Sequence, residues 1–198
     1  METQVAAISR PMKLNLGAGE TYLDGYVNVD WNSIIAVDVT HDLNKLPYPF
    51  ESNSFDEILA SHVLEHLDRP FSIMTELHRI LKPNGLLHIK VPHFSRGFTH
   101  AEHCHGFDVS FPKYFDPSFT KSGYFGTAFR LDELRLQWLA SPHLLQYFGY
   151  GKISAALARC ADRVFSGIGN CSPNICSRLW CYWVGGFEQI EFKFRAMK

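Results

Sequence analysis

The sequence has no long hydrophobic run, no excess of either charge, and an odd number of cysteines. No stretch of its 198 residues reaches the ~20 apolar residues of a membrane span, and the N-terminus lacks the basic flank and apolar run of a signal peptide. Five cysteines suit a reducing cytoplasm better than a disulfide framework. A formal net charge of −1 gives no field that would attract nucleic acid or an anionic membrane. We therefore expect a cytoplasmic protein with no membrane span and no nucleic-acid partner.

The chain also lacks internal repeats, low-complexity stretches and linkers. Its length suits one domain with a sizeable core, and a hydrophobic share of 46% is ordinary for a globular protein. Phe is abundant, with 16 copies, so the core or a substrate surface is rich in aromatic rings. We expect residues 1–198 to form a single domain.

A glycine-rich turn near the N-terminus is the most informative local pattern. The apolar segment 12–16 leads into glycines at positions 17 and 19, and a second apolar segment, 26–29, ends on Asp30. A strand, a glycine turn and a strand ending in a carboxylate form the layout of a nucleoside-binding crevice in an open α/β sheet. Glycine permits the sharp turn and lets a ligand lie on bare backbone, and a ribose diol can donate hydrogen bonds to Asp30. A dinucleotide fingerprint would need glycine at position 22, where the chain has Tyr22.

Strands and helices alternate through the first half of the chain. After the two strands around the glycine turn, we expect strands within 34–43, at 55–61 and at 86–91, and a helix from Pro70 to Lys82 that the segment 83–85 ends. Near the C-terminus, Ile190, Phe192 and Phe194 alternate with charged residues, as in a half-exposed strand. This pattern predicts an α/β, Rossmann-like fold with a mostly parallel sheet and an antiparallel C-terminal strand.

Residues 93–183 interrupt the alternation. Up to about residue 150 they are dense in Phe, Tyr and His without a clean period, and only Leu134, Leu136 and Trp138 alternate as in a strand. Between 151 and 168 one apolar stripe recurs at helical spacing, with Gly167 and Gly169 as candidate stops. Because this large insertion precedes the last strand, we expect it to form a cap over the C-terminal edge of the sheet.

Several blocks within residues 12–93 resemble class I S-adenosylmethionine-dependent methyltransferases, in particular the small type 11-like enzymes of bacteria and archaea. These blocks are Leu14–Gly19, Val29–Asp30, His41–Pro47, Ser54–Ile58, Ser61–His66 and Leu81–Gly85. Two positions depart from the family pattern. Asn15 stands where the family usually has an acidic residue, and Thr21 replaces its third glycine.

The resemblance implies S-adenosyl-L-methionine as the cofactor and assigns its contacts by position. The backbone of 17–19 would face the methionine part, Asp30 the ribose hydroxyls, and Asp42 with Leu43 the adenine edge. Ser61 and His62 would border the sulfonium and the acceptor. The full set of implied cofactor residues is Asn15, Leu16, Gly17, Ala18, Gly19, Asp30, Trp31, Asp42, Leu43, Ser61 and His62.

Methyl transfer from a sulfonium is an in-line displacement, so positioning supplies much of the rate. A hydroxyl acceptor also needs a base for its proton, and histidines at strand ends and in the insertion are the candidates. These are His62, His66, His93, His100, His103 and His105. We predict His62 or His93 as the base, because each follows a strand on the side where such crevices open. Glu65 and His66 are interpreted as shaping the pocket.

Three histidines lie close together at positions 100, 103 and 105, which raises the question of a metal. Zinc sites usually show two close ligand pairs, and the three C-terminal cysteines, spaced five residues apart, fit no such pattern. We therefore predict no metal.

The insertion also carries aromatic residues interleaved with these histidines: Phe98, Phe107, Phe111, Tyr114, Phe115 and Tyr124. Flat apolar faces beside neutral hydrogen-bonding groups suit a glycan or a small hydroxylated metabolite better than a phosphate-rich acceptor. The alternative is that these rings form the insertion's own core. The predicted function is O-methylation of such an acceptor. The alternative functions are a catalytically silent S-adenosylmethionine-binding partner protein and a small nucleotide-dependent oxidoreductase.

Overall fold

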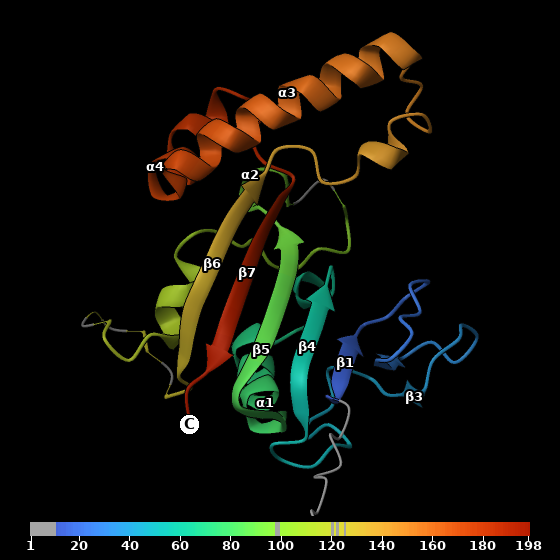
Figure 1. Cartoon of the computed structure of the whole chain (residues 1–198), viewed down its shortest axis with the longest axis vertical. Helices are drawn as coiled ribbons and strands as arrows, with labels where there is room; N and C mark the ends of the chain where they lie inside the picture. Colours follow the sequence, from blue (N-terminus) through green and yellow to red (C-terminus); the bar gives the residue numbers. More distant parts are fainter. Residues whose placement is uncertain (1–10, 98–99, 120, 122, 125) are drawn as a thin grey trace, which may run out of the picture.

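A seven-stranded sheet forms the centre of the protein, with the strand order β3-β2-β1-β4-β5-β7-β6 (Figure 1). The computed structural model describes residues 11–97, 100–119, 121, 123–124 and 126–198. The strands are β1 Lys13–Leu16, β2 Val27–Asp30, β3 Val39–Thr40, β4 Phe55–Ser61, β5 Leu81–Pro92, β6 Phe129–Gln137 and β7 Gln189–Ala196. The helices are α1 Pro70–Ile80, α2 Phe94–Gly97, α3 Lys152–Cys171 and α4 Pro173–Arg178, with 3-10 turns η1 Leu64–His66, η2 Phe111–Phe115, η3 Pro142–Leu144 and η4 Trp180–Tyr182.

Strand directions confirm the predicted Rossmann-like α/β class. β1 pairs in parallel with β2 on one side and with β4 on the other. β3 is parallel to β2, and β5 is parallel to β4. β7 runs antiparallel to both β5 and β6, between which it lies. The carboxyl ends of β1, β2 and β4 therefore meet at one edge, where a crevice forms in such sheets.

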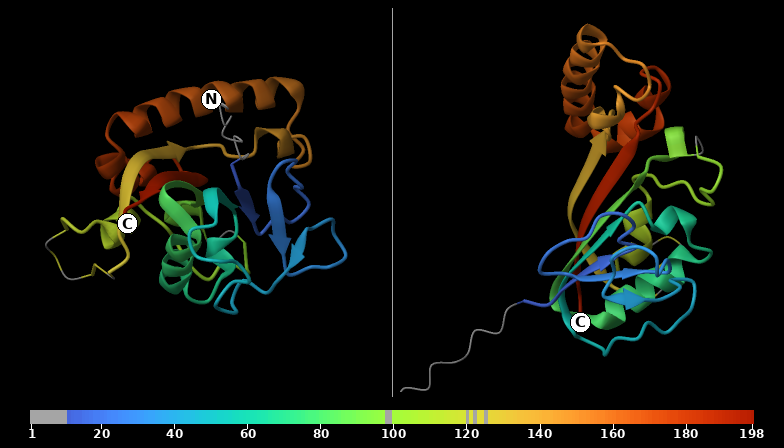
Figure 2. Two further views of the ribbon diagram at one scale, coloured as in Figure 1. Left: turned by 60° about the horizontal axis from the view of Figure 1, so that its bottom comes forward. Right: turned by 90° about the vertical axis from the view of Figure 1, so that its right-hand side faces the viewer.

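The core lies on one face of the sheet only. α1 and η2 cover this face (Figure 2), and it buries the alternate apolar residues of the strands, among them Leu16, Ile58, Ile89 and Phe192. In the described part of the chain, the opposite face of β1, β4 and β5 carries no helix. Its side chains are charged and paired instead.

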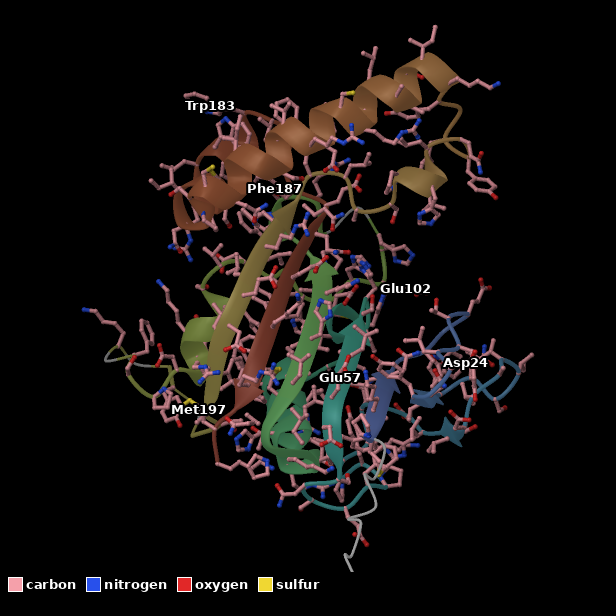
Figure 3. The ribbon with its side chains drawn as sticks, in the orientation of Figure 1. Asp24, Glu57, Glu102, Trp183, Phe187 and Met197 are labelled. Carbon is pink, nitrogen blue, oxygen red and sulfur yellow. The ribbon has the colours of Figure 1, made fainter. Side chains whose placement is uncertain are left out.

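Ion pairs cross the uncovered face from strand to strand. Lys13 Nζ lies 2.8 Å from Glu57 Oε2, His88 Nε2 lies 3.3 Å from Glu191 Oε2, and a third pair joins β7 to β6 at 2.7 Å. Figure 3 labels Glu57 on this face. These charged side chains are partly exposed, so this face of the sheet is polar and compatible with contact with water.

Helix α1 begins at Pro70, whose fixed φ suits the first helical position. Its buried face includes Ile73, Leu77 and Ile80. The helix ends at Ile80 rather than at Lys82, because Leu81 is already extended and pairs with Phe55 of β4.

The segment 93–183, expected as one cap, divides between three places. Residues 100–104 lie beside η1, where the Cys104 N–H donates to the Glu65 carbonyl over 2.8 Å. The aromatic stretch that follows packs under the sheet, and β6 joins the sheet itself as an edge strand. The part from η3 through η4 lies across the C-terminal edge, where α2 lies as well (Figure 1).

Three of the predicted aromatic rings form core, as in the alternative interpretation, whereas Tyr124 is 39% exposed. Phe107, Phe111 and Phe115 are buried, and the Phe111 ring lies 5.6 Å from that of Phe192 on β7. They are therefore not an acceptor surface. Phe98 lies outside the described residues.

Helix α3 confirms the predicted helix, but the apolar stripe faces solvent rather than the core. Ile153 and Leu157 are 80% and 65% exposed, and Val164 and Ile168 are exposed as well. The helix also runs past the two glycines expected as stops, to Cys171. Among the described residues, no helix has the length and apolar character needed to cross a membrane.

Candidate functional site

The glycine turn after β1 takes the conformation that its glycines allow. Gly17 and Gly19 have φ of +66° and +51°, in the left-handed region. A Cβ on Gly17 would lie 2.5 Å from Cγ2 of Val63, so the turn after β1 packs directly on the chain that leaves β4. The space around Gly19 is open. The turn therefore offers bare backbone at the carboxyl end of β1.

Asp30 is fixed at the end of β2 by two backbone N–H groups. Gly19 N donates to its Oδ2 over 2.9 Å, and Asn32 N donates to its Oδ1 over 3.0 Å. The side chain thus ties the glycine turn to the second strand. Trp31, which follows, is 73% exposed and leaves a large aromatic surface beside the carboxylate.

Asn15 is buried and braces the loop between β1 and β2. Its Nδ2 donates to the Thr21 carbonyl over 2.8 Å and to Asn28 Oδ1 over 3.0 Å. Asn28 in turn is held by Asp38, whose Oδ2 accepts the Asn28 N–H over 2.7 Å. No helix lies between β1 and β2, whose connecting residues 17–26 are all described, so these amide contacts hold the loop in its place.

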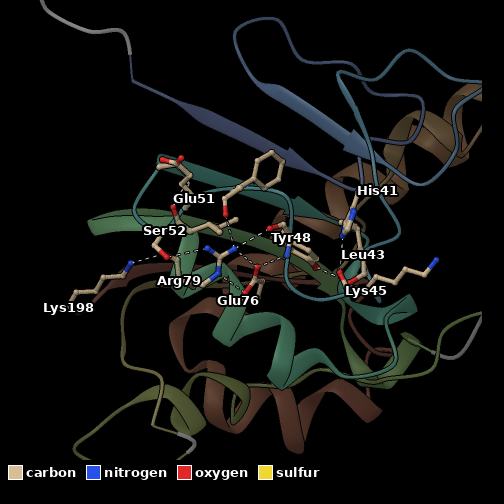
Figure 4. A network of polar contacts seen from close by, with 12 residues as sticks. His41, Leu43, Lys45, Tyr48, Glu51, Ser52, Glu76, Arg79 and Lys198 are labelled. Carbon is tan, nitrogen blue, oxygen red and sulfur yellow. Dashed lines mark hydrogen bonds and ion pairs between the residues drawn. The ribbon is translucent and has the colours of Figure 1, made fainter.

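Helix α1 holds the loop that carries Asp42 and Leu43 (Figure 4). Glu76 Oε1 accepts the Tyr48 N–H over 2.7 Å, and the Tyr48 hydroxyl donates to the Leu43 carbonyl over 3.1 Å. Arg79 binds Glu76 over 2.6 Å. Burial opposes ionisation of Glu76, but the Arg79 guanidinium holds the pKa of this carboxyl below its usual value. A charged pair on the helix thus sets the position of the predicted adenine edge.

Ser61 ends β4, and His62 follows it with a φ of +54°, which is unusual for a residue other than glycine. The His62 N–H donates to the Lys90 carbonyl over 2.8 Å, which aligns it with the end of β5. Its Nε2 lies 2.8 Å from Gln189 Oε1, and its Nδ1 lies 3.4 Å from Glu65 Oε1. The Glu65 carboxylate raises the pKa of His62 above its ordinary value, against the opposing effect of burial.

His93 is fully buried at the end of β5, with 0% exposure. Nδ1 lies 2.7 Å from the Ser95 hydroxyl, and Nε2 lies 2.8 Å from the Ser177 hydroxyl. Burial lowers its pKa to about 4, although Asp108 acts in the opposite direction. Both ring nitrogens are therefore occupied, and the ring joins the sheet to α4.

A pocket of about 750 Å³ opens between the C-terminal edge of the sheet and the η3–α3 segment. Its walls include His62, His103 and three aromatic residues: Trp138, Phe148 and Tyr150. Arg96 and Glu188 also line it, and their charged groups lie 3.1 Å apart, so they compensate each other. The pocket is aromatic, rich in histidine and close to neutral.

The residues that the sequence predicted at the crevice come from the ends of four neighbouring strands, β3, β2, β1 and β4. The aromatic wall was missed, because Trp138, Phe148 and Tyr150 gather only when α3 folds back over the sheet. Glu65 was also missed as a partner of His62. The i, i+3 spacing of His62 and Glu65 was the available signal. Figure 3 labels Glu102, on the loop that runs beside this part of the site.

Comparison with known proteins agrees with this geometry. Residues 14–89 match the family model described as a methyltransferase domain. A putative methyltransferase from Bacillus halodurans C-125 has a TM-score of 0.57 and 14% identity, over 98% of this chain and 95% of that chain. A SAM-dependent methyltransferase from Archaeoglobus fulgidus has a TM-score of 0.56 and 16% identity, over 94% of this chain and 86% of that chain. At such identities the structures show the shared fold alone. Comparison with curated proteins gives no match.

Proposed function

We propose that this chain, whose residues 14–89 match a methyltransferase domain, transfers the methyl group of S-adenosylmethionine to a hydroxyl of an uncharged, ring-containing acceptor. A glycan or a small hydroxylated metabolite is the class we infer. The pocket between His62 and the aromatic wall carries this proposal, because it places a basic side chain beside flat apolar surfaces. A phosphate-rich acceptor would call for unpaired basic groups, whereas Arg96 of this pocket is matched by Glu188.

The proposed cofactor residues lie at the ends of four neighbouring strands, β1 to β4. We place the methionine part of S-adenosyl-L-methionine over the turn 17–19, the ribose on Asp30, and the adenine between Trp31 and the loop of Asp42 and Leu43. The Asp30 carboxylate keeps acceptor capacity, because each oxygen has two lone pairs and receives one backbone N–H. Asn15, Leu16 and Ala18 support the turn, and Ser61 borders the sulfonium.

Of the two predicted bases, we propose His62. It lines the pocket and is partly exposed, whereas His93 is fully buried between the Ser95 and Ser177 hydroxyls. When bound, S-adenosyl-L-methionine would supply the methyl group. The His62 imidazole would take the proton of the acceptor hydroxyl on Nδ1, because Nε2 already carries the hydrogen that Gln189 Oε1 accepts. Glu65 and Gln189 then stabilise the imidazolium, since both present oxygen atoms to its ring nitrogens.

Turnover with a panel of sugar, lipid and phenolic acceptors tests the proposal. His62→Ala should lower turnover on the accepted substrate by about 10²–10⁴, while the affinity for S-adenosylhomocysteine stays near that of the wild type. His88→Gln, on the uncovered face of β5, is the matched control and should keep turnover. Wild-type turnover in His62→Ala would refute the base, and exclusive methylation of an amine or a carbon acid would refute the acceptor class.

A further inference from the structure

Three metal-ligating side chains from two separate segments meet beside the acceptor pocket. Glu65 and His66 belong to η1, directly after β4, and His103 belongs to the loop after α2. One ligand atom from each lies within 4.8 Å of the others, a grouping found in a search of the described residues. The backbone fixes this meeting, because the Cys104 N–H donates to the Glu65 carbonyl over 2.8 Å.

The carboxylate of this cluster is buried without hydrogen bonds. Glu65 has 0% exposure, and within the described part of the chain neither of its oxygens has a hydrogen-bond partner. His62 Nδ1 lies 3.4 Å from Oε1, which is ion-pair distance without hydrogen-bonding geometry. Burying a carboxylate without hydrogen-bond partners is costly, and a bound cation would offset that cost. Oε1 faces His62, which leaves Oε2 for such an ion.

Both histidines are held in the orientation that metal ligands usually have. Nδ1 of His66 lies 3.2 Å from the Glu102 carbonyl, and Nδ1 of His103 is hydrogen-bonded to the Gly97 carbonyl. A carbonyl accepts, so each Nδ1 carries the hydrogen and each Nε2 presents its lone pair. A metal-bound imidazole typically donates its other N–H to a backbone carbonyl or a carboxylate in this way.

We propose that Glu65, His66 and His103 bind one divalent transition-metal ion of the zinc class. Two imidazoles and a carboxylate are a common ligand set for such ions. Binding would draw the three ligand atoms together, since each lies about 2.1 Å from the metal in zinc sites. Three protein ligands leave at least one position of a four-coordinate ion open, and one of the three ligand residues, His103, also lines the acceptor pocket.

This site does not depend on the proposed acceptor or on His62 as the base, and its test is direct binding. The full-length protein, freed of metal with a chelator, is titrated with Zn²⁺ by calorimetry and with Co²⁺ by visible absorption. The wild type should bind one equivalent at micromolar concentrations. The Co²⁺ bands should report nitrogen and oxygen ligands, and Zn²⁺ should raise the melting temperature.

Three variants and one control locate the ion. His66→Ala and His103→Ala, at partly exposed positions, should each weaken Zn²⁺ binding by at least about 10-fold, and Glu65→Gln should do the same with the side-chain shape kept. His105→Ala is the matched control, because His105 lies on the same loop but lines a different pocket with Phe71. The proposal is overturned if the wild type binds no Zn²⁺, or if the two alanine variants bind it as the control does. Either result would leave the turnover tests of His62 unaffected.

Discussion

His93 shows how a residue that looks catalytic in the sequence can instead hold two parts of a protein together. It follows a strand at the edge where the crevice opens, which is why we predicted it as a base. In the structure its ring lies between the Ser95 and Ser177 hydroxyls and packs at 5.6 Å from the Phe187 ring. We expect it to matter for stability rather than for proton transfer.

The pH dependence of folding tests this role of His93. Its folded-state pKa of about 4 lies below the ordinary 6.5, so the unfolded chain binds the proton more tightly. Neutral His93 therefore contributes fully to the free energy of unfolding above about pH 6.5. This contribution decreases by on the order of 3 kcal/mol as the pH falls toward 4. Urea unfolding between pH 7 and 4 measures this, and His93→Gln should show a shallower dependence. Equal slopes for the two proteins would contradict it.

The two glycines of the turn after β1 should respond differently to the same substitution. Gly17→Ala places a Cβ in the left-handed region and 2.5 Å from Val63, so we expect a loss of about 2–4 kcal/mol in the free energy of unfolding. Gly19→Ala meets open space and should cost only about 1–2 kcal/mol, the price of the left-handed backbone.

Urea unfolding of the two variants checks this contrast, and calorimetry with S-adenosylhomocysteine adds a second measurement. Gly19→Ala should weaken ligand binding more than it weakens folding, because its methyl group points into the space that we assign to the cofactor. Equal stabilities of the two variants would show that Val63 moves aside without cost.

At the scale of elements, the sequence predicted the parts in which one residue pattern has one structural meaning. The strand 55–61, the start of α1 and the alternation of Ile190, Phe192 and Phe194 were all confirmed. The glycine turn and the strand that ends at Asp30 could be predicted for the same reason, because both are local patterns in the sequence.

What the sequence did not predict depends on contacts between distant segments. Phe107, Phe111 and Phe115 are suitable for either a core or a binding surface, and only the position of β7 decides that they are core. Glu65 and His103 are 38 positions apart by their numbers, and nothing local indicates that the loop after α2 returns to η1. The direction in which the α3 stripe faces likewise depends on its neighbours.

Helix α3 yields a prediction from its outward stripe. Because Leu157 and Ile168 are exposed, Leu157→Lys and Ile168→Lys should each change the free energy of unfolding by less than about 0.5 kcal/mol. Ala155, which is buried against Leu139 and Leu145, is the control, and Ala155→Lys should destabilise strongly. Thermal melting of the three variants decides this, and a large loss from the two exposed positions would mean that the stripe is covered in solution.

At the scale of the whole molecule, the protein keeps a complete sheet with few covering helices. The crevice depends on strand ends and on the side-chain bracing by Asn15, Asn28 and Asp38, which takes the place that a helix after the glycine turn would otherwise fill. The uncovered face relies on ion pairs between neighbouring strands. The residues that we propose for cofactor binding lie at the strand ends and in the loops that follow them, whereas the main core lies on the opposite side of the sheet from the ion pairs.

The position of β7 has a consequence for how the protein is made. β7 lies between β5 and β6 but follows both of them in the chain, so neither strand can pair with it until it has left the ribosome. At about 5–20 residues per second, roughly 100 residues separate the emergence of β5 from that of β7 and take some 5–20 s. Throughout that interval one edge of β5 is unpaired, and the Phe side chains that later pack against β7 are exposed. Nascent chains of this length should therefore be good clients for chaperones that bind exposed strands and aromatic residues.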